Sequence, residues 1–121
     1  MKIAIINGTI VNSDEKFKAN ILIENGKIAK IGSEKFEADK VIDASNKLVM
    51  PGLIDMHVHF RDPGLEYKDD INTGSETAVA GGVTTCCPMA NTNPVNDNAV
   101  VTRDMVAKAR ARGLIDLLPI G

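Results

Sequence analysis

The sequence has no strong excess of either charge and no long apolar segment. Its 121 residues include 14 lysines and arginines against 16 aspartates and glutamates, a formal net charge of −2. A nucleic acid or an anionic membrane would favour a basic surface, so neither is an expected partner. No apolar run is long enough to span a membrane, and the apolar part of the N-terminus is too short for a signal peptide. We therefore expect a cytoplasmic protein.

Cysteine and histidine are also scarce, with two of each. Cys86 and Cys87 are adjacent, and on a strand adjacent side chains point to opposite faces, which argues against a disulfide between them. Reduced, structural cysteines are the expectation for a cytoplasmic protein. Because the side chains would not converge, we do not expect a zinc site made of both cysteines and both histidines.

Residues 1–50 read as an all-β scaffold without a functional site. We expect short strands at 2–6, 9–11, 20–24, 27–31, 41–43 and 48–50. Asn25-Gly26 is typical of a two-residue hairpin turn, in which both central residues need positive φ. Asn7-Gly8 carries the same signal and predicts a second turn. The scattered charges of this region fit a solvated face.

From residue 51 onward, strand and helix patterns alternate. We expect a strand at 53–59, a helix at 71–80, a strand at 83–87, a helix at 100–112 and a strand at 114–118. Gly81-Gly82 and Gly113 end the two helices, and Val101, Met105 and Ala109 form an apolar face on the second. This alternation predicts an α/β fold with a parallel sheet. An eight-stranded βα barrel needs at least about 200 residues, so residues 51–121 would be the first three strands and two helices of an incomplete, TIM-like barrel.

The only two histidines, His57 and His59, end the first strand of this region. On a strand, residues i and i+2 point to the same face, about 6.6 Å apart along the chain. Imidazole nitrogens bind zinc at about 2.0–2.1 Å, so the two rings can share one ion. Plain surface polarity near a turn is the alternative. The apolar approach and the charged exit after His59 favour a strand that delivers polar groups to its C-terminal end.

The run Asp55-Met-His-Val-His-Phe-Arg-Asp-Pro-Gly64 resembles the cyclic amidohydrolases and, within them, the dihydroorotases of the longer bacterial type. Gly81-Gly-Val-Thr-Thr85 and Pro88-Met-Ala-Asn-Thr-Asn-Pro94 are a second match to the same family. The resemblance implies a metal-dependent-hydrolase barrel preceded by a small β-sandwich, to which residues 1–50 would belong. It also implies zinc-dependent, reversible hydrolysis of the cyclic amide of dihydroorotate to N-carbamoyl-L-aspartate, a step of pyrimidine biosynthesis.

By this likeness His57 and His59 would bind zinc, which lowers the pKa of bound water and polarises a carbonyl group. Arg61 would bind the substrate carboxylate, because a guanidinium group matches a carboxylate with two hydrogen bonds. Local ion pairs of Arg61 with Asp62 or Asp69 are the alternative.

Asn91 would bind the substrate from the loop after the second barrel strand, since its amide both donates and accepts hydrogen bonds. Simple turn formation is the alternative for Asn91. Asp55 is expected to be an orienting or structural carboxylate, for example one that supports a histidine, rather than a metal ligand.

The sequence departs from the family in one large respect. The family site also uses a second metal, a bridging lysine carbamate or aspartate, two further histidines and a catalytic aspartate. Both histidines of this sequence are already assigned. We therefore expect no catalytic acid or base among these residues, weak zinc binding or none, and no activity of the 121 residues alone.

Two other functions remain open at this point. A hydantoinase, dihydropyrimidinase or allantoinase would share the His-x-His strand but would need no carboxylate clamp at Arg61. A non-catalytic dihydroorotase-like subunit would support an aspartate transcarbamoylase. In addition, an open edge at the third strand of the barrel region would allow self-association into a homo-oligomer.

Overall fold

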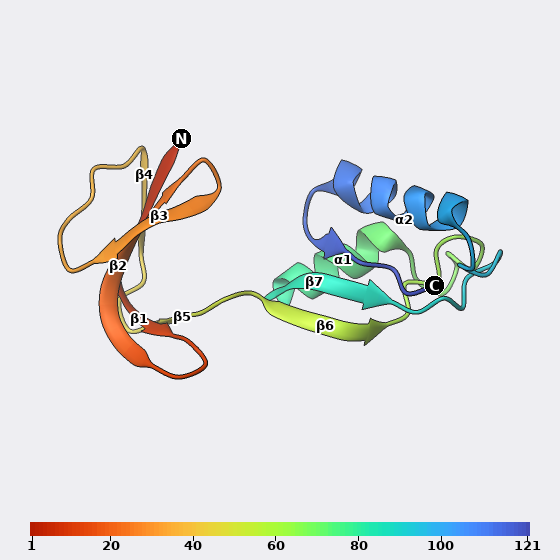
Figure 1. Cartoon of the computed structure of the whole chain (residues 1–121), viewed down its shortest axis with the longest axis horizontal. Coiled ribbons are helices and arrows are strands. Elements are labelled where there is room, and N and C mark those ends of the chain that lie inside the picture. Colours follow the sequence, from red (N-terminus) through yellow and green to blue (C-terminus); the bar gives the residue numbers. More distant parts are fainter. The chain divides into compact units, whose positions relative to one another are not determined.

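The computed structural model describes residues 1–121, and the chain divides into two compact units, residues 1–51 and 52–121 (Figure 1). The first unit contains only strands, and the second contains three strands and two helices. The expected mixed α/β class is confirmed.

A five-stranded sheet forms the first unit. Its strands are β1 (Lys2–Val11), β2 (Lys16–Glu24), β3 (Lys27–Gly32), β4 (Lys40–Asp43) and β5 (Leu48–Val49). The order is β3-β2-β1-β4, and β5 also pairs with β1. β1, β2 and β3 are antiparallel neighbours, whereas β4 and β5 run parallel to β1. The predicted hairpin is confirmed, because Asn25 and Gly26 have φ values of 51° and 75°.

The predicted turn at Asn7-Gly8 is wrong. Both residues lie inside β1, where the pairing with β2 shifts register between Ile5 and Gly8. Asn7 has a φ of 63°, and its backbone N–H donates to Oδ1 of Asn20 over 2.9 Å. The positive φ that suits asparagine in a turn here serves a β-bulge. The strand therefore continues to Val11 instead of ending at Ile6.

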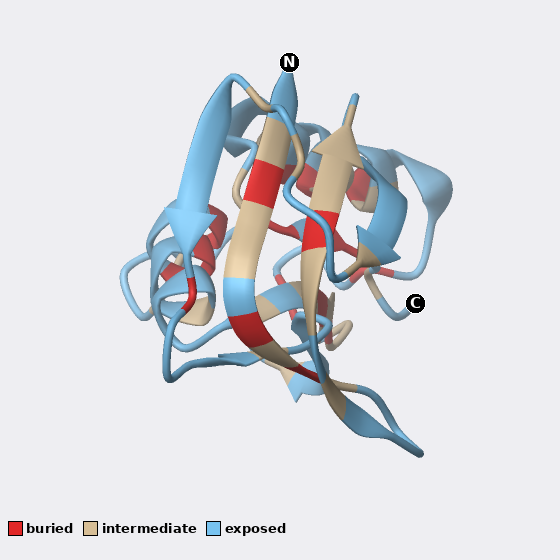
Figure 2. Cartoon of the chain, turned by 90° about the vertical axis from the view of Figure 1, so that its left-hand side faces the viewer, coloured by how far each residue is buried: buried red, intermediate tan, exposed pale blue.

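Isoleucine side chains of the first unit line a pocket of about 290 Å³. Its lining includes Ile5, Ile10, Ile21, Ile23, Ile28 and Ile31. Of these, only Ile10 and Ile21 are buried. In Figure 2 the buried positions of the strands appear as separate bands between intermediate and exposed ones. Apart from Asn12, the pocket lining offers no polar side chain for chemistry.

A parallel three-stranded sheet with two helices forms the second unit. Its elements are β6 (Leu53–Val58), α1 (Ile71–Ala80), β7 (Val83–Pro88), α2 (Ala99–Arg112) and β8 (Asp116–Leu117). The strand order is β6-β7-β8, with both pairings parallel as predicted. Several predicted boundaries differ by one residue: β6 ends at Val58 rather than His59, β7 ends at Pro88 rather than Cys87, and α2 begins at Ala99 rather than Val100. The last strand covers two residues rather than 114–118.

Side chains and glycines in the sequence set the helix ends. Asp70 caps the N-terminus of α1 by accepting hydrogen bonds from two backbone N–H groups, and Asn98 caps α2 in the same way. Gly113 ends α2 with a φ of 68°, as expected for a left-handed C-terminal residue. No helix in the chain is both long and apolar enough to cross a membrane.

Both helices pack on the same face of the β6-β7-β8 sheet. The core between them consists of Phe60, Ile71, Cys86, Val101, Met105, Ala109, Ile115 and Leu117. The predicted apolar face of α2 is confirmed, because Val101, Met105 and Ala109 are all buried. Ile54 and Met56 of β6 remain exposed. The core fixes the ends of β6 and β7, and with them the two loops that carry the predicted site residues.

Candidate functional site

His57 and His59 lie at the C-terminal end of β6, and both are exposed. Their ring centroids are 5.2 Å apart, with the ring planes at 71° to each other. Oδ1 of Asp55 accepts a hydrogen bond from the backbone N–H of His57 over 3.0 Å. Of the two expected roles, orienting or structural, this contact fits the structural one, because the carboxylate binds the main chain of His57.

Arg61 follows the histidines in the β6–α1 loop. It has a φ of 58°, a left-handed conformation that is uncommon outside glycine. Its carbonyl oxygen accepts a hydrogen bond from the N–H of Leu65 over 2.9 Å. The alternative ion pairs are absent: Asp62 pairs with Lys108, and Asp69 accepts from the hydroxyl of Thr73 over 3.1 Å. The guanidinium group forms no ion pair and is therefore available for an anionic ligand.

Asn91 lies in the β7–α2 loop and meets His59 directly. Oδ1 of Asn91 is 2.9 Å from Nδ1 of His59. An Nδ1–H on the imidazole would donate to this amide oxygen and leave Nε2 free. The sequence pattern places Asn91 at the same edge of the sheet but does not predict this contact.

The two histidines fit half of a zinc site. Zinc in proteins is usually bound by four ligands, and a histidine ligand commonly donates its second ring N–H to an oxygen acceptor. His59 has such an acceptor in Asn91. No group of three or more histidine, cysteine, aspartate or glutamate side chains forms a metal cluster in the chain. These residues would therefore supply two ligands to an ion that needs further donors.

The cysteines are both free, with Cys86 buried and Cys87 half-buried. Burial raises the pKa of the Cys86 thiol, and the charges of Asp55 and Cys87 raise it further. Only the thiolate is a good zinc ligand, so a raised pKa makes Cys86 a poor one.

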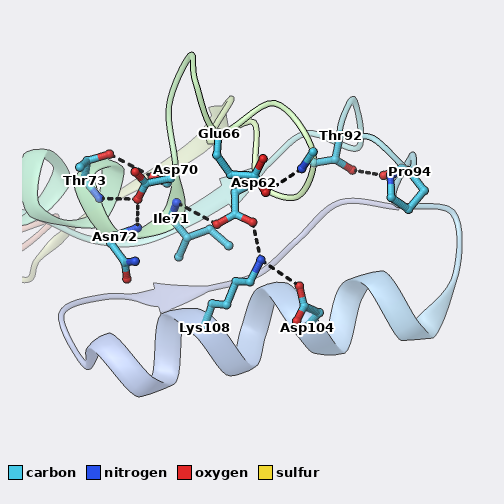
Figure 3. Close-up of polar contacts among 11 residues, drawn as sticks. Asp62, Glu66, Asp70, Ile71, Asn72, Thr73, Thr92, Pro94, Asp104 and Lys108 are labelled. Atoms are coloured by element: carbon cyan, nitrogen blue, oxygen red, sulfur yellow. Dashed lines mark hydrogen bonds and ion pairs between the residues drawn. The ribbon is translucent and has the colours of Figure 1, made fainter.

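The contact between Asp62 and Lys108 is not predicted by the sequence. Asp62 follows Arg61, and its Oδ1 lies 2.6 Å from Nζ of Lys108 on α2 (Figure 3). Burial of the ammonium group lowers its pKa, but hydrogen bonds to Asp62 and Asp104 outweigh this, and the pKa of Lys108 is raised overall. In the sequence, Asp62 looks like a turn residue before proline, and Lys108 looks like part of a solvated helix face. One feature of the sequence points to a role for Lys108. It directly precedes the buried Ala109 and so lies at the edge of the apolar face of α2.

The loops after β6 and β7 also contact each other through their main chains. The N–H of Asn93 donates to the carbonyl of Pro63 over 2.9 Å. Gly64 has a φ of 90°, and a Cβ at this position would overlap the carbonyl oxygen of Asn93. Glycine is thus needed at residue 64 both for its conformation and for the close approach of the two loops.

Comparison with known proteins identifies the family. A model of the family described as Dihydro-orotase-like matches residues 46–121, which is more than half of the chain. The chain belongs to the dihydroorotase-like family. Proteins named dihydroorotase from Geobacter sulfurreducens and Syntrophotalea carbinolica are 47% and 48% identical to it over 125 and 126 residues. Each alignment covers 100% of this chain and 29% of the relative, so the dihydroorotase-like chain spans about three tenths of the length of these relatives.

Solved structures similar to this dihydroorotase-like chain include hydantoinases. An L-hydantoinase (dihydropyrimidinase) from Arthrobacter aurescens superposes with a TM-score of 0.90 and 34% sequence identity, over 98% of this chain and 27% of that chain. The predicted resemblance to dihydroorotases is confirmed at the level of the family by the match to residues 46–121. The similarity to solved hydantoinases agrees with the alternative expected from the sequence, which is a hydantoinase, dihydropyrimidinase or allantoinase.

Proposed function

We propose that the protein acts as a dihydroorotase, which reversibly hydrolyses the cyclic amide of dihydroorotate to N-carbamoyl-L-aspartate in pyrimidine biosynthesis. One observation carries the proposal: the unpaired guanidinium of Arg61 lies on the loop that directly follows the two histidines. Dihydroorotate has both a ring amide to be cleaved and a carboxylate. The guanidinium of Arg61 matches the carboxylate, and zinc held in part by the two histidines matches the ring amide.

In this proposal each of four side chains has a separate task. His57 and His59 hold zinc, which when bound supplies an acidified water and polarises the ring carbonyl. Arg61 binds the substrate carboxylate and so places the ring. The amide nitrogen of Asn91 donates to the substrate, while its oxygen accepts from His59.

Hydrolysis adds the elements of water across one ring bond. The hydroxyl goes to the carbonyl carbon, the carbon–nitrogen bond breaks, and the proton goes to the nitrogen. We assign none of the four side chains as the acid or base of this step, because each already has a binding task. Their shared contribution is to hold the reacting groups in place.

The finer architecture is part of the same proposal. Residues 52–121 would be the first three strands and two helices of a metal-dependent-hydrolase barrel, and the first unit would belong to a β-sandwich. Parallel strands with both helices on one face support this assignment. So does the position of the site residues, since βα-barrel enzymes place their active sites at the carboxyl ends of the strands.

Arg61→Met tests the proposal most simply, in the full-length, zinc-loaded protein. Methionine keeps part of the volume of arginine but cannot bind a carboxylate. We expect the variant to lose turnover of dihydroorotate while its zinc content stays at the wild-type level. A variant with wild-type turnover would contradict the assignment of Arg61.

A hydantoinase or dihydropyrimidinase is the second candidate, and the similarity to solved hydantoinases favours it. Such an enzyme cleaves cyclic amides that lack the carboxylate. It would therefore retain its activity in the Arg61→Met variant, whereas a dihydroorotase would not.

The remaining expectations concern partners and location. An aspartate transcarbamoylase partner, a homo-oligomer and a cytoplasmic location all stay predictions. Co-purification with transcarbamoylase activity and the molecular mass in solution would test the first two.

A further inference from the structure

Asp62 is the only buried charged residue of the chain, with 4% of its surface exposed. A buried carboxylate is costly unless it is paired and hydrogen-bonded. Asp62 meets this need with two partners on different elements: Nζ of Lys108 lies 2.6 Å from Oδ1, and the N–H of Ile71 lies 3.4 Å from Oδ2. It thus joins the β6–α1 loop to the start of α1 and to α2.

Lys108 links this carboxylate to α2. It lies on α2, 46 residues after Asp62, and its ammonium group also contacts Asp104 over 3.1 Å. α2 is held in the core by Met105, which has no exposed surface. The position of Asp62 is therefore fixed by the packed part of the second unit rather than by the loop alone.

Arg61, the residue before Asp62, depends on such an anchor. Its φ of 58° is unfavourable for any residue that carries a Cβ, and it persists only where the surroundings impose it. Its guanidinium forms no ion pair that would hold the side chain from its far end. The backbone of Arg61 is held by the N–H of Leu65, which donates to its carbonyl over 2.9 Å. It is also held by its two chain neighbours, the buried Phe60 and Asp62. Asp62 is the neighbour whose side chain joins the loop to α2.

The same loop is tied to the loop that carries Asn91. Pro63 accepts a hydrogen bond from Asn93 over 2.9 Å, and Gly64 lies against the carbonyl of Asn93. A displacement of Asp62 would consequently displace both Arg61 and Asn91, the two side chains that are proposed to bind the substrate.

We propose that the Asp62–Lys108 ion pair holds Arg61 in its left-handed conformation and thereby sets the affinity of the site for the substrate carboxylate. Asp62 and Lys108 are positioning residues that do not touch the substrate. The inference rests on the proposed function, because it takes Arg61 as the carboxylate-binding residue. It adds that specificity for an anionic substrate depends on a residue of α2 far from the site in sequence.

Steady-state kinetics of the full-length, zinc-loaded protein test this role. Lys108→Met should raise KM for dihydroorotate and weaken inhibition by orotate, which carries the same carboxylate, each on the order of tenfold. The kcat should stay within about twofold of wild type, because a binding contact remote from the reacting bond acts equally on ground and transition states. Zinc content should not change.

Two further variants separate positioning from folding. Asp62→Leu combined with Lys108→Met replaces the ion pair by apolar side chains and avoids an unpaired buried carboxylate, so it provides the same readouts if the single variant does not fold. Glu76→Gln is the matched control, because it removes the Arg112–Glu76 ion pair, which also joins α1 to α2 but involves neither loop. We expect the control to keep the wild-type KM.

The outcomes distinguish the two proposals. An active wild-type protein whose KM and orotate inhibition are unchanged in both Lys108 variants would overturn the positioning role alone. An equal rise of KM in Glu76→Gln would also overturn it, since general loosening of the helices would then suffice. A zinc-loaded wild-type protein that does not hydrolyse dihydroorotate would overturn the proposed function, and the positioning role with it.

Discussion

Nδ1 of His59 lies 2.9 Å from Oδ1 of Asn91, although the two residues are 32 positions apart in sequence and lie in different loops. The contact joins a proposed metal ligand to a proposed substrate-binding residue. Asn91 can thus act in two ways, by orienting the imidazole and by binding substrate with its remaining amide group.

Substitution of Asn91 separates these two roles. Asn91→Ala removes the acceptor for Nδ1–H, and we expect zinc affinity to fall by about 10- to 100-fold, the usual effect of losing such a partner. Asn91→Asp keeps an acceptor and should retain zinc, but its negative charge should raise KM for dihydroorotate. Competition with a chromophoric chelator measures the affinity, and equal zinc affinity in Asn91→Ala and wild type would refute the orienting role.

Asp70 should make the stability of α1 sensitive to acid. Hydrogen bonds from the N–H of Thr73, above all, lower the pKa of Asp70 below its ordinary value of 3.8. The charged form is therefore favoured in the folded state. Its contribution is fully present above the unfolded pKa and is lost as pH falls through the lower folded pKa.

Two variants of Asp70 test this cap. Asp70→Ala should lower the free energy of unfolding by about 1 kcal/mol at neutral pH, the typical cost of losing an N-terminal cap. Asp70→Asn retains a good capping side chain and should cost less, while losing the acid dependence of this site. Denaturant titrations between pH 7 and pH 3 provide the comparison. If the free energy of unfolding had the same pH dependence in wild type and Asp70→Asn, Asp70 would not be a source of the acid sensitivity.

Gly74 should resist replacement by alanine although it lies inside α1. Helix propensity alone favours alanine over glycine by about 1 kcal/mol. However, a Cβ on Gly74 would lie 2.5 Å from Cδ1 of the buried Phe60, and overpacking of a core typically costs about 1–3 kcal/mol. We expect Gly74→Ala to be destabilising on balance.

Gly81→Ala is the control for this prediction. Gly81 has a φ of −86°, and its added Cβ would have only ordinary contacts, the nearest at 3.5 Å. Its stability change should stay within about 0.5 kcal/mol. If thermal unfolding showed Gly74→Ala to be the more stable of the two variants, the packing of Phe60 against α1 would be wrong.

The sequence predicts best what depends on neighbouring residues. The Asn25-Gly26 hairpin and the left-handed Gly113 follow from local conformational preferences, and the buried face of α2 follows from spacing. The same local reasoning fails at Asn7-Gly8, because a positive φ serves turns and bulges equally well. Only the pairing with β2, which is not local, decides between them.

The candidate site shows the same limit. Alternation of strands and helices places Arg61 and Asn91 at one edge of the sheet, since parallel strands end together. It does not predict that Asn91 meets His59, nor that Asp62 binds Lys108 instead of Arg61. Both contacts join residues that are distant in sequence, and they depend on how α2 packs on the sheet.

Comparison of two substrates that differ only in the carboxylate tests the account most directly. The full-length, zinc-loaded protein should hydrolyse dihydroorotate and should show little turnover of dihydrouracil, which has the same ring without the carboxylate. In Arg61→Met, turnover of dihydroorotate should be lost. A wild-type protein that prefers dihydrouracil, or that turns over dihydroorotate equally well without Arg61, would contradict the account.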